Sequence, residues 1–187
     1  GAFGKFQEIA PEVLRANFET NVMALLHLAR QVAPQMIAAG GGALVVTGNT
    51  SALRGKPNFA GFAPTKAAQR ILTESIARDL GPQGVHVAYL VIDAVIDVPW
   101  ARQRFKDASD DFFIKPAAIA EEIHHIAHQD RSAWSFSLKC APTVNPGSND
   151  KTGDSRWFRI SPSPVARSHA SKAWRSRRRP GCRRGTS

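Results

Sequence analysis

Residues 47–66 read "TGNTSALRGKPNFAGFAPTK", and the interpretation of the whole chain starts from this stretch. It begins at the end of an apolar run, continues through a loop that contains glycine, and ends in a helix that carries Lys66. Several enzymes keep their acid-base groups in such a strand-loop-helix unit. Yet the stretch contains no tyrosine, histidine, cysteine or carboxylate that could transfer a proton. The sequence therefore predicts either an active site or the frame of one without its proton donor.

The apolar pattern on both sides of this stretch predicts alternating helices and strands. Residues 11–40 place apolar side chains at helical spacings, and Pro34 is expected to bend or restart that helix. Three glycines at residues 40–42 should end the helix, after which "ALVVTG" reads as a short strand buried in a parallel sheet. Further along we expect a helix over 59–80, a strand over 85–92, helices near 99–105 and 116–129, and a last strand over 133–140.

This order of elements predicts an α/β fold with a parallel sheet and right-handed crossovers. Ligands of such sheets bind at the carboxyl ends of the strands, which are residues 48–51 and 92–98 here. No predicted strand is followed by a glycine-rich phosphate loop, because the three glycines precede their strand. The sequence thus shows part of a nucleotide-binding architecture without the part that holds a pyrophosphate.

The net charge of +10 is concentrated at the carboxyl end of the chain. Residues 150–187 hold 11 Lys and Arg against 2 Asp, whereas residues 1–149 hold 14 against 13. We expect one folded domain over 1–147 and a disordered basic tail over 148–187, since the tail is too poor in apolar residues to fold. Two interpretations of the tail stay open: it contacts nucleic acid non-specifically through phosphates, or it is sequence that is not native to the protein.

The cysteine content and the hydropathy of the chain indicate the cellular compartment in which the protein is expected. The two cysteines, Cys140 and Cys182, are far apart and do not resemble a disulfide framework, which favours a reducing compartment. No apolar run approaches the roughly 20 residues of a membrane helix, and no signal peptide is recognisable. We therefore expect a cytoplasmic protein with no membrane contact. The chain opens without methionine and without a first strand, so we also expect a fragment.

Three stretches carry a resemblance to a known family: "FETNVMALLHLARQVAPQMIAAGGGALVVTG", "FAGFAPTKAAQRILTESIARDLGPQGVHVAYLVID" and "IDVPW". Together they resemble the carboxyl-terminal two-thirds of the short-chain dehydrogenase/reductase family, over about residues 1–140. The resemblance implies a Rossmann-like doubly wound parallel sheet, truncated at its amino terminus, with NAD or NADP as cofactor and a small alcohol or carbonyl compound as substrate. The family's glycine-rich cofactor motif would lie upstream of Gly1.

In that family an asparagine, a serine, a tyrosine and a lysine act together. The resemblance assigns the asparagine, which supports a water relay, to Asn21, and the lysine, which holds the nicotinamide ribose, to Lys66. The tyrosine position, four before the lysine, is occupied by Phe62, and the serine position by Asn49. Phenylalanine cannot titrate, so the predicted site lacks its proton donor. The amide of Asn49 could still donate a hydrogen bond to a carbonyl oxygen.

A second set of site residues follows the strand at 85–92, where the chain reads "IDAVIDV" and the family usually has Pro-Gly. The resemblance implies cofactor contacts from Asp93, Ala94, Ile96 and Val98. Ala94 stands at the glycine position, and Val98 stands where the family has a threonine that contacts the nicotinamide amide. Both departures weaken the expected cofactor contacts.

Alternatives remain beside these assignments. Phe62 and Asn49 are equally compatible with a non-catalytic relative that dimerises or senses a cofactor, and Asn21 with a structural hydrogen bond. The helices at 11–39 and 59–80 resemble the pair that forms dimers in the family, so we expect a homo-oligomer. His124 and His128 have a spacing that can bind zinc, but without a third ligand a solvated helix face is favoured, and no metal is expected.

Overall fold

A three-stranded parallel sheet forms the centre of the part of the chain that the structure, a computed structural model, describes, residues 3–142. The strands are β1 (Gly42–Asn49), β2 (Val85–Ile92) and β5 (Ser137–Cys140), in the order β1-β2-β5. Gly42 lies opposite Val85 and Asn49 opposite Ile92, so β1 and β2 end at the same level. The predicted basic tail and the domain boundary at 147 lie outside the described residues.

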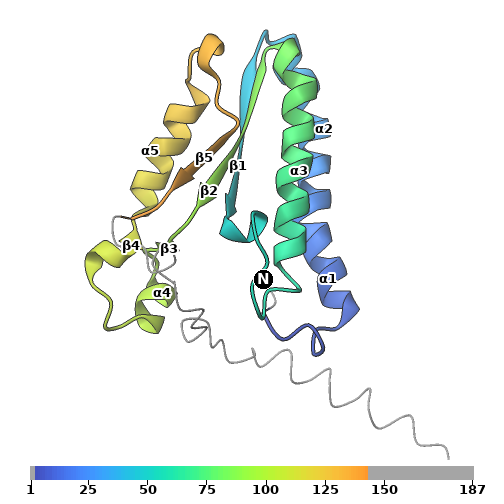
Figure 1. Cartoon of the computed structure of the whole chain (residues 1–187). Coiled ribbons are helices and arrows are strands. Elements are labelled where there is room, and N and C mark those ends of the chain that lie inside the picture. Colours follow the sequence, from blue (N-terminus) through green and yellow to red (C-terminus); the bar gives the residue numbers. More distant parts are fainter. Residues whose placement is uncertain (1–2, 143–187) are drawn as a thin grey trace, which may run out of the picture. The chain divides into compact units, whose positions relative to one another are not determined.

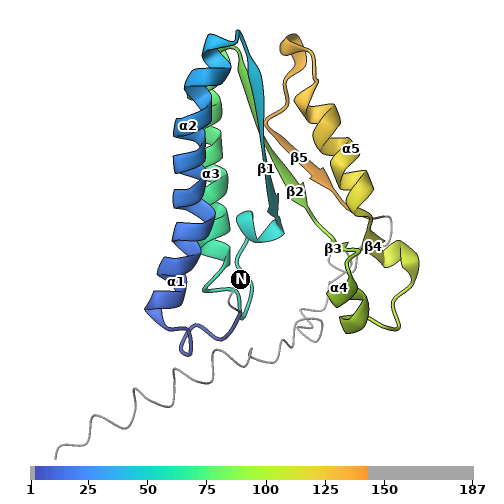
Figure 2. The same ribbon diagram turned by 180° about the vertical axis from the view of Figure 1, so that it is seen from behind.

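Helices cover both faces of this sheet, as Figures 1 and 2 show. One face carries α2 (Ala24–Ala38) and α3 (Ala63–Leu80), and the other carries α5 (Pro116–Ala127). Every residue of β2 except the last is buried, which explains its unbroken apolar run. The predicted α/β class with a Rossmann-like parallel sheet is confirmed.

The first long helix differs from the prediction in where it is irregular. It runs as α1 (Pro11–Phe18), a π-helical turn η1 (Glu19–Met23) and α2, and Pro34 lies inside α2 without restarting it. The predicted restart at Pro34 is therefore wrong. The predicted end is confirmed, because Gly40 has a positive φ of 81° and the Gly41 N–H donates back to the Met36 carbonyl at 2.9 Å.

Two further boundaries differ from the prediction. The helix expected over 59–80 begins at Ala63, because Pro64, which lacks an N–H, fits only in the first turn of a helix. The last strand begins at Ser137 and not at residue 133, because the Trp134 indole N–H donates to the Gln129 carbonyl at 3.1 Å and holds this segment against the end of α5.

The loop after β2 forms a small substructure, in which the sequence predicted the helix near 99–105 but not the pairing of two short strands. Strand β3 (Val95–Ile96) pairs with β4 (Phe113–Ile114), and α4 (Pro99–Arg104) lies between them in sequence. Arg102 joins the two sides, since its guanidinium contacts Asp97 through two hydrogen bonds of 2.6 and 2.8 Å and Asp110 through one of 2.5 Å. These contacts lower the pKa of Asp97 and hold the loop closed on itself.

Tyr89, on β2, lies at the centre of the core between the sheet and α2 and α3. Its side chain is fully buried and packs with Leu25, Val46 and Val91. The ring lies directly over Gly48 of β1, where a β-carbon would stand 1.9 Å from the hydroxyl oxygen. That oxygen is buried and has no hydrogen-bond partner among the described residues.

The buried hydroxyl of Tyr89 predicts a loss of stability at alkaline pH. Burial raises the pKa of Tyr89 to about 12, whereas an unfolded chain titrates its tyrosine near pH ~10. The folded state therefore favours the protonated phenol, and this stabilisation is complete below about pH 10 and lost as the pH rises through about 12. At about 1.4 kcal/mol per pKa unit, we expect the free energy of unfolding to fall by about 2–3 kcal/mol.

Urea titrations across this pH range, on the parent and on Tyr89→Phe, measure the effect. The variant removes the hydroxyl and keeps the ring, so the titration of every other group cancels in the comparison. An identical alkaline loss in both proteins would contradict the prediction.

Candidate active site

Lys66 lies on the first turns of α3, and its side chain is only 7% exposed. Its ammonium donates to the carbonyl oxygen of Thr47 at 3.4 Å and to Oε1 of Gln69 at 2.5 Å. Thr47 belongs to β1, so the charge is held near the carboxyl end of that strand. Among residues 3–142, no carboxylate lies within ion-pair distance of it. Burial lowers the pKa of Lys66 below its ordinary value.

A short chain of hydrogen bonds joins the π-helical turn to the start of α3. The Asn21 amide donates from Nδ2 to Thr65 Oγ1 at 3.0 Å, and Thr65 Oγ1 donates to the Phe62 carbonyl at 2.8 Å. One turn earlier, Asn17 Nδ2 donates to the Gly61 carbonyl at 2.6 Å. Asn21 therefore makes a structural hydrogen bond, which was one of the two roles that the sequence allowed for this residue. Isolated π-turns of this kind often accompany functional sites.

Phe62 stands immediately before α3, one turn from Lys66, whose backbone N–H donates to the Phe62 carbonyl at 3.2 Å. Its ring is half-buried and packs against Phe3, with the ring centroids 5.5 Å apart. The side chain that replaces the expected tyrosine is thus an apolar ring in an aromatic contact, and it offers no proton.

Asn49, the last residue of β1, caps the following turn η2 (Thr50–Ala52). Its Oδ1 accepts the Ser51 N–H at 3.0 Å. Nδ2 is the end of the amide that this cap does not use, so it can donate a hydrogen bond to a ligand oxygen. Thr47 and Asn49 are two residues apart on β1, which brings Asn49 to the same strand end as the Lys66 ammonium.

The four loop residues expected at the cofactor make other contacts. The Asp93 carboxylate pairs with Lys139 of β5 at 2.6 Å. Ala94 and Ile96 pack into the apolar cluster under α5, and Val98 packs into the cluster around α4. The structure thus groups Asn21, Asn49, Phe62 and Lys66 around β1 and α3, and it gives Asp93, Ala94, Ile96 and Val98 contacts with β5, α5 and α4.

The loop between β1 and α3 borders a cavity of about 620 Å³. Ala63, Pro64 and Ala67 line it, whereas Phe62 and Lys66 do not. Since Lys66 does not line it, this cavity is not the space in front of the ammonium.

Two residues of the site were not identified from the sequence. Thr65 is fully buried and links Asn21 to Phe62, and Gln69 accepts a hydrogen bond from Lys66. The spacing could have identified Gln69, because residues three apart share a helix face. No spacing in the sequence points to Thr65, because its hydrogen-bond partner Asn21 lies 44 residues away along the chain.

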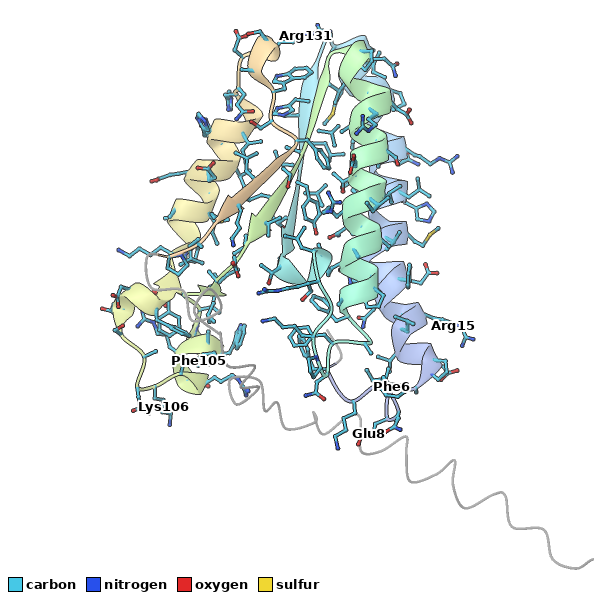
Figure 3. The ribbon with its side chains drawn as sticks, in the orientation of Figure 1. Phe6, Glu8, Arg15, Phe105, Lys106 and Arg131 are labelled. Carbon is cyan, nitrogen blue, oxygen red and sulfur yellow. The ribbon has the colours of Figure 1, made fainter. Side chains whose placement is uncertain are left out.

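The carboxyl ends of the strands point toward the end of the molecule that carries α4, as Figure 3 shows by the position of Phe105, while Arg131 lies at the opposite end. Among residues 3–142, no group of three or more His, Cys, Asp and Glu side chains is close enough to hold a metal ion. His124 and His128 stack on each other with ring centroids 4.1 Å apart. None of the helices in this part of the chain has the length and hydropathy to span a bilayer.

The sequence matches a profile of the family described as short chain dehydrogenase over residues 1–108. One similar curated protein is 2,3-dihydroxy-2,3-dihydro-p-cumate dehydrogenase of Pseudomonas putida, 31% identical over 136 residues, which are 68% of this chain and 50% of that protein. Another is the human dehydrogenase/reductase SDR family member 4, 26% identical over 139 residues, 74% of this chain and 49% of that protein. The chain spans about half the length of these relatives.

Solved structures agree on the fold. A short-chain dehydrogenase from Rhodopseudomonas palustris is 32% identical, with a TM-score of 0.62 over 76% of this chain and 57% of that one. A short chain oxidoreductase from Pseudomonas aeruginosa PAO1, described as NADPH-bound and as containing an atypical catalytic center, is 18% identical, with a TM-score of 0.68 over 78% of this chain and 62% of that one. The first of these likenesses agrees with the family profile, and the second shows the fold alone.

Proposed function

Since this chain belongs to the short chain dehydrogenase family, we propose that it acts in NAD- or NADP-dependent oxidation of a small alcohol or reduction of a carbonyl compound, with a site that lacks its own phenolic acid. The observation that carries the proposal is the buried Lys66 ammonium, held at the carboxyl end of β1. That strand end is where parallel α/β sheets bind their ligands.

The residues around Lys66 fit one part of a nicotinamide cofactor. An ammonium has three N–H donors, and two of them reach Thr47 and Gln69, so the third can donate to a ribose hydroxyl. The cofactor, when bound, supplies or accepts the hydride. Within the described residues 3–142, no strand is followed by a glycine-rich loop, so these residues offer no comparable fit for the pyrophosphate.

The roles proposed for the other residues follow from their chemistry. The Nδ2 of Asn49 donates to the substrate oxygen and stabilises the negative charge that grows there as a carbonyl is reduced. Phe62 keeps water away from that oxygen but cannot provide its proton. Positioned proton transfer is worth typically ~10²–10⁴ in rate, so a site without it should turn over slowly.

Weak cofactor binding that depends on Lys66 tests this proposal. Titration of the chain with NADH or NADPH, followed by nicotinamide fluorescence, should give a dissociation constant on the order of 1 mM, which corresponds to about −4 kcal/mol. Lys66→Met should abolish the signal, while Lys106→Met, on an exposed loop, should leave it unchanged. Equal binding by the Lys66 variant would contradict the proposed role of that residue, and micromolar binding would show that the pyrophosphate is held after all.

We propose that the protein forms homo-oligomers in the cytoplasm. Two features support self-association: Leu28 of α2 and Ile71 of α3 are each 53% exposed, and β1 is an uncharged edge strand of the sheet described over residues 3–142. Sedimentation at tens of micromolar should show a dimer or larger species. Leu28→Glu with Ile71→Glu should weaken a helix-mediated dimer, and Thr47→Lys should weaken pairing through the strand edge. A monomeric parent would contradict both routes.

A further inference from the structure

Gln69 lies one turn beyond Lys66 on the same side of α3 and is the nearest acceptor for its ammonium, with Oε1 2.5 Å from Nζ. Side chains on a helix point back toward its amino terminus, so Gln69 reaches back over Lys66. The turn behind Gln69 is fixed as well, because the fully buried Thr73 donates from Oγ1 to the Gln69 carbonyl at 2.7 Å.

The Lys66 ammonium depends on few acceptors. Apart from Gln69, the one other acceptor it reaches in the described part of the chain is the Thr47 carbonyl, at the longer distance of 3.4 Å. Both acceptors are neutral, and the residue is only 7% exposed to solvent. A buried charge is costly unless its hydrogen bonds are made, so removal of either acceptor should displace or neutralise the amine.

We propose that Gln69 is a positioning residue, whose amide oxygen holds the Lys66 ammonium against β1 and thereby leaves one N–H free to meet a ligand at the strand end. The amide suits this task because it is an acceptor without charge. A carboxylate at residue 69 would form an ion pair with the ammonium and compete with the ligand, and an apolar side chain would leave Lys66 with Thr47 alone.

Other charged groups around Lys66 do not account for its lowered pKa. Strand β1 has no titratable side chain, and burial is the resolved cause of the lowered pKa of Lys66. The titratable groups on α3 and on the elements packed against it, α1, α2, η1 and β2, are Glu12, Arg15, Glu19, His27, Arg30, Arg70, Glu74, Arg78, Asp79, His86 and Tyr89. The hydrogen bond that the Lys66 ammonium donates to Gln69 is therefore the local contact whose loss should be detectable at Lys66.

The test is an NMR titration of the lysine side chains in the full chain labelled with ¹³C and ¹⁵N lysine. The signal of Lys66 is identified by its loss in Lys66→Arg. We expect Gln69→Leu to lower the pKa of Lys66 by about one further unit, and Gln69→Glu to raise it by at least as much, since an opposite charge at this distance shifts a pKa by about 1–3 units. The matched control, Gln103→Leu on the exposed face of α4, should leave it unchanged.

An unchanged pKa of Lys66 in both Gln69 variants, each folded by circular dichroism, would overturn the inference. The inference rests on the proposed function for its ligand, but the two can fail separately. Suppose the pKa of Lys66 falls in Gln69→Leu and rises in Gln69→Glu, but the parent binds no NADH or NADPH. The positioning role then stands and the cofactor proposal fails. If the parent binds cofactor and Gln69→Leu binds it equally well with the same pKa of Lys66, the positioning role fails.

Discussion

Gly48→Ala is expected to destabilise the protein by about 3 kcal/mol or more, at the upper end of what overpacking a core causes. The added β-carbon would stand 1.9 Å from Oη and 2.1 Å from Cζ of Tyr89, distances at which one of the two residues must move. Tyr89 cannot easily move, because its ring is fully buried against Leu25, Val46 and Val91. Gly48 also lies opposite Val91 in the ladder that joins β1 to β2 along their full length, so a shift of its backbone would disturb the sheet.

Chemical denaturation of the parent and the variant measures this effect, and Gly55→Ala is the matched control. No atom lies within 4 Å of a β-carbon at Gly55, and its φ is not positive, so that change should stay within about 0.5 kcal/mol of the parent. Combining Gly48→Ala with Tyr89→Val should cost less than the sum of the two single changes, because they share one contact. A Gly48→Ala variant as stable as the Gly55 control would show that the core around Tyr89 is loosely packed.

Phe62→Tyr combined with Asn49→Ser is expected to raise the rate of alcohol oxidation or carbonyl reduction by about 10² or more, if proton transfer limits the parent. The new hydroxyl would stand one helical turn before Lys66, whose ammonium stabilises a phenolate and so lowers its pKa. Because the chain spans about half the length of its relatives, the assay uses it preceded by the amino-terminal half of a family member.

The controls separate a restored acid from a general effect of an added hydroxyl. Phe105→Tyr makes the same chemical change beside α4 and should leave the rate unchanged. Lys66→Met in the restored background should remove the gain. The parent is assayed first on a panel of small alcohols and ketones. If it already turns over at about 1–10 per second, an ordinary rate for an enzyme, the inference that the site lacks its acid is wrong.

The local pattern of the sequence was sufficient for the elements of the fold. The apolar run of β2 and the Gly40–Gly42 helix end are properties of neighbouring residues, and both are confirmed. The π-turn at Glu19–Met23 was not predictable in this way, because the hydrogen bond from its Asn21 to Thr65 joins residues 44 positions apart. The same reason explains why the pairing of β3 with β4, and the Arg102 contacts that close it, were missed.

Some residues of the candidate site, but not all of their contacts, could be predicted from the sequence. The resemblance to the family identified Lys66 and the two substituted positions, Phe62 and Asn49, and the structure brings Lys66 and Asn49 to the same strand end. Spacing could not reveal that Asp93 pairs with Lys139, since β5 meets β2 only after α5 has crossed the sheet.

Tyr89 is the only tyrosine in the sequence. Its phenolate would therefore be the sole source of the tyrosine ultraviolet difference band, which makes the residue an intrinsic optical reporter of the core. After a jump to alkaline pH, the absorbance of the phenolate would show how fast the buried Tyr89 hydroxyl becomes accessible to hydroxide and loses its proton. A rate equal to that of global unfolding would show that α2, α3 and the sheet separate as one cooperative unit, and a faster rate would reveal a partial opening around Gly48.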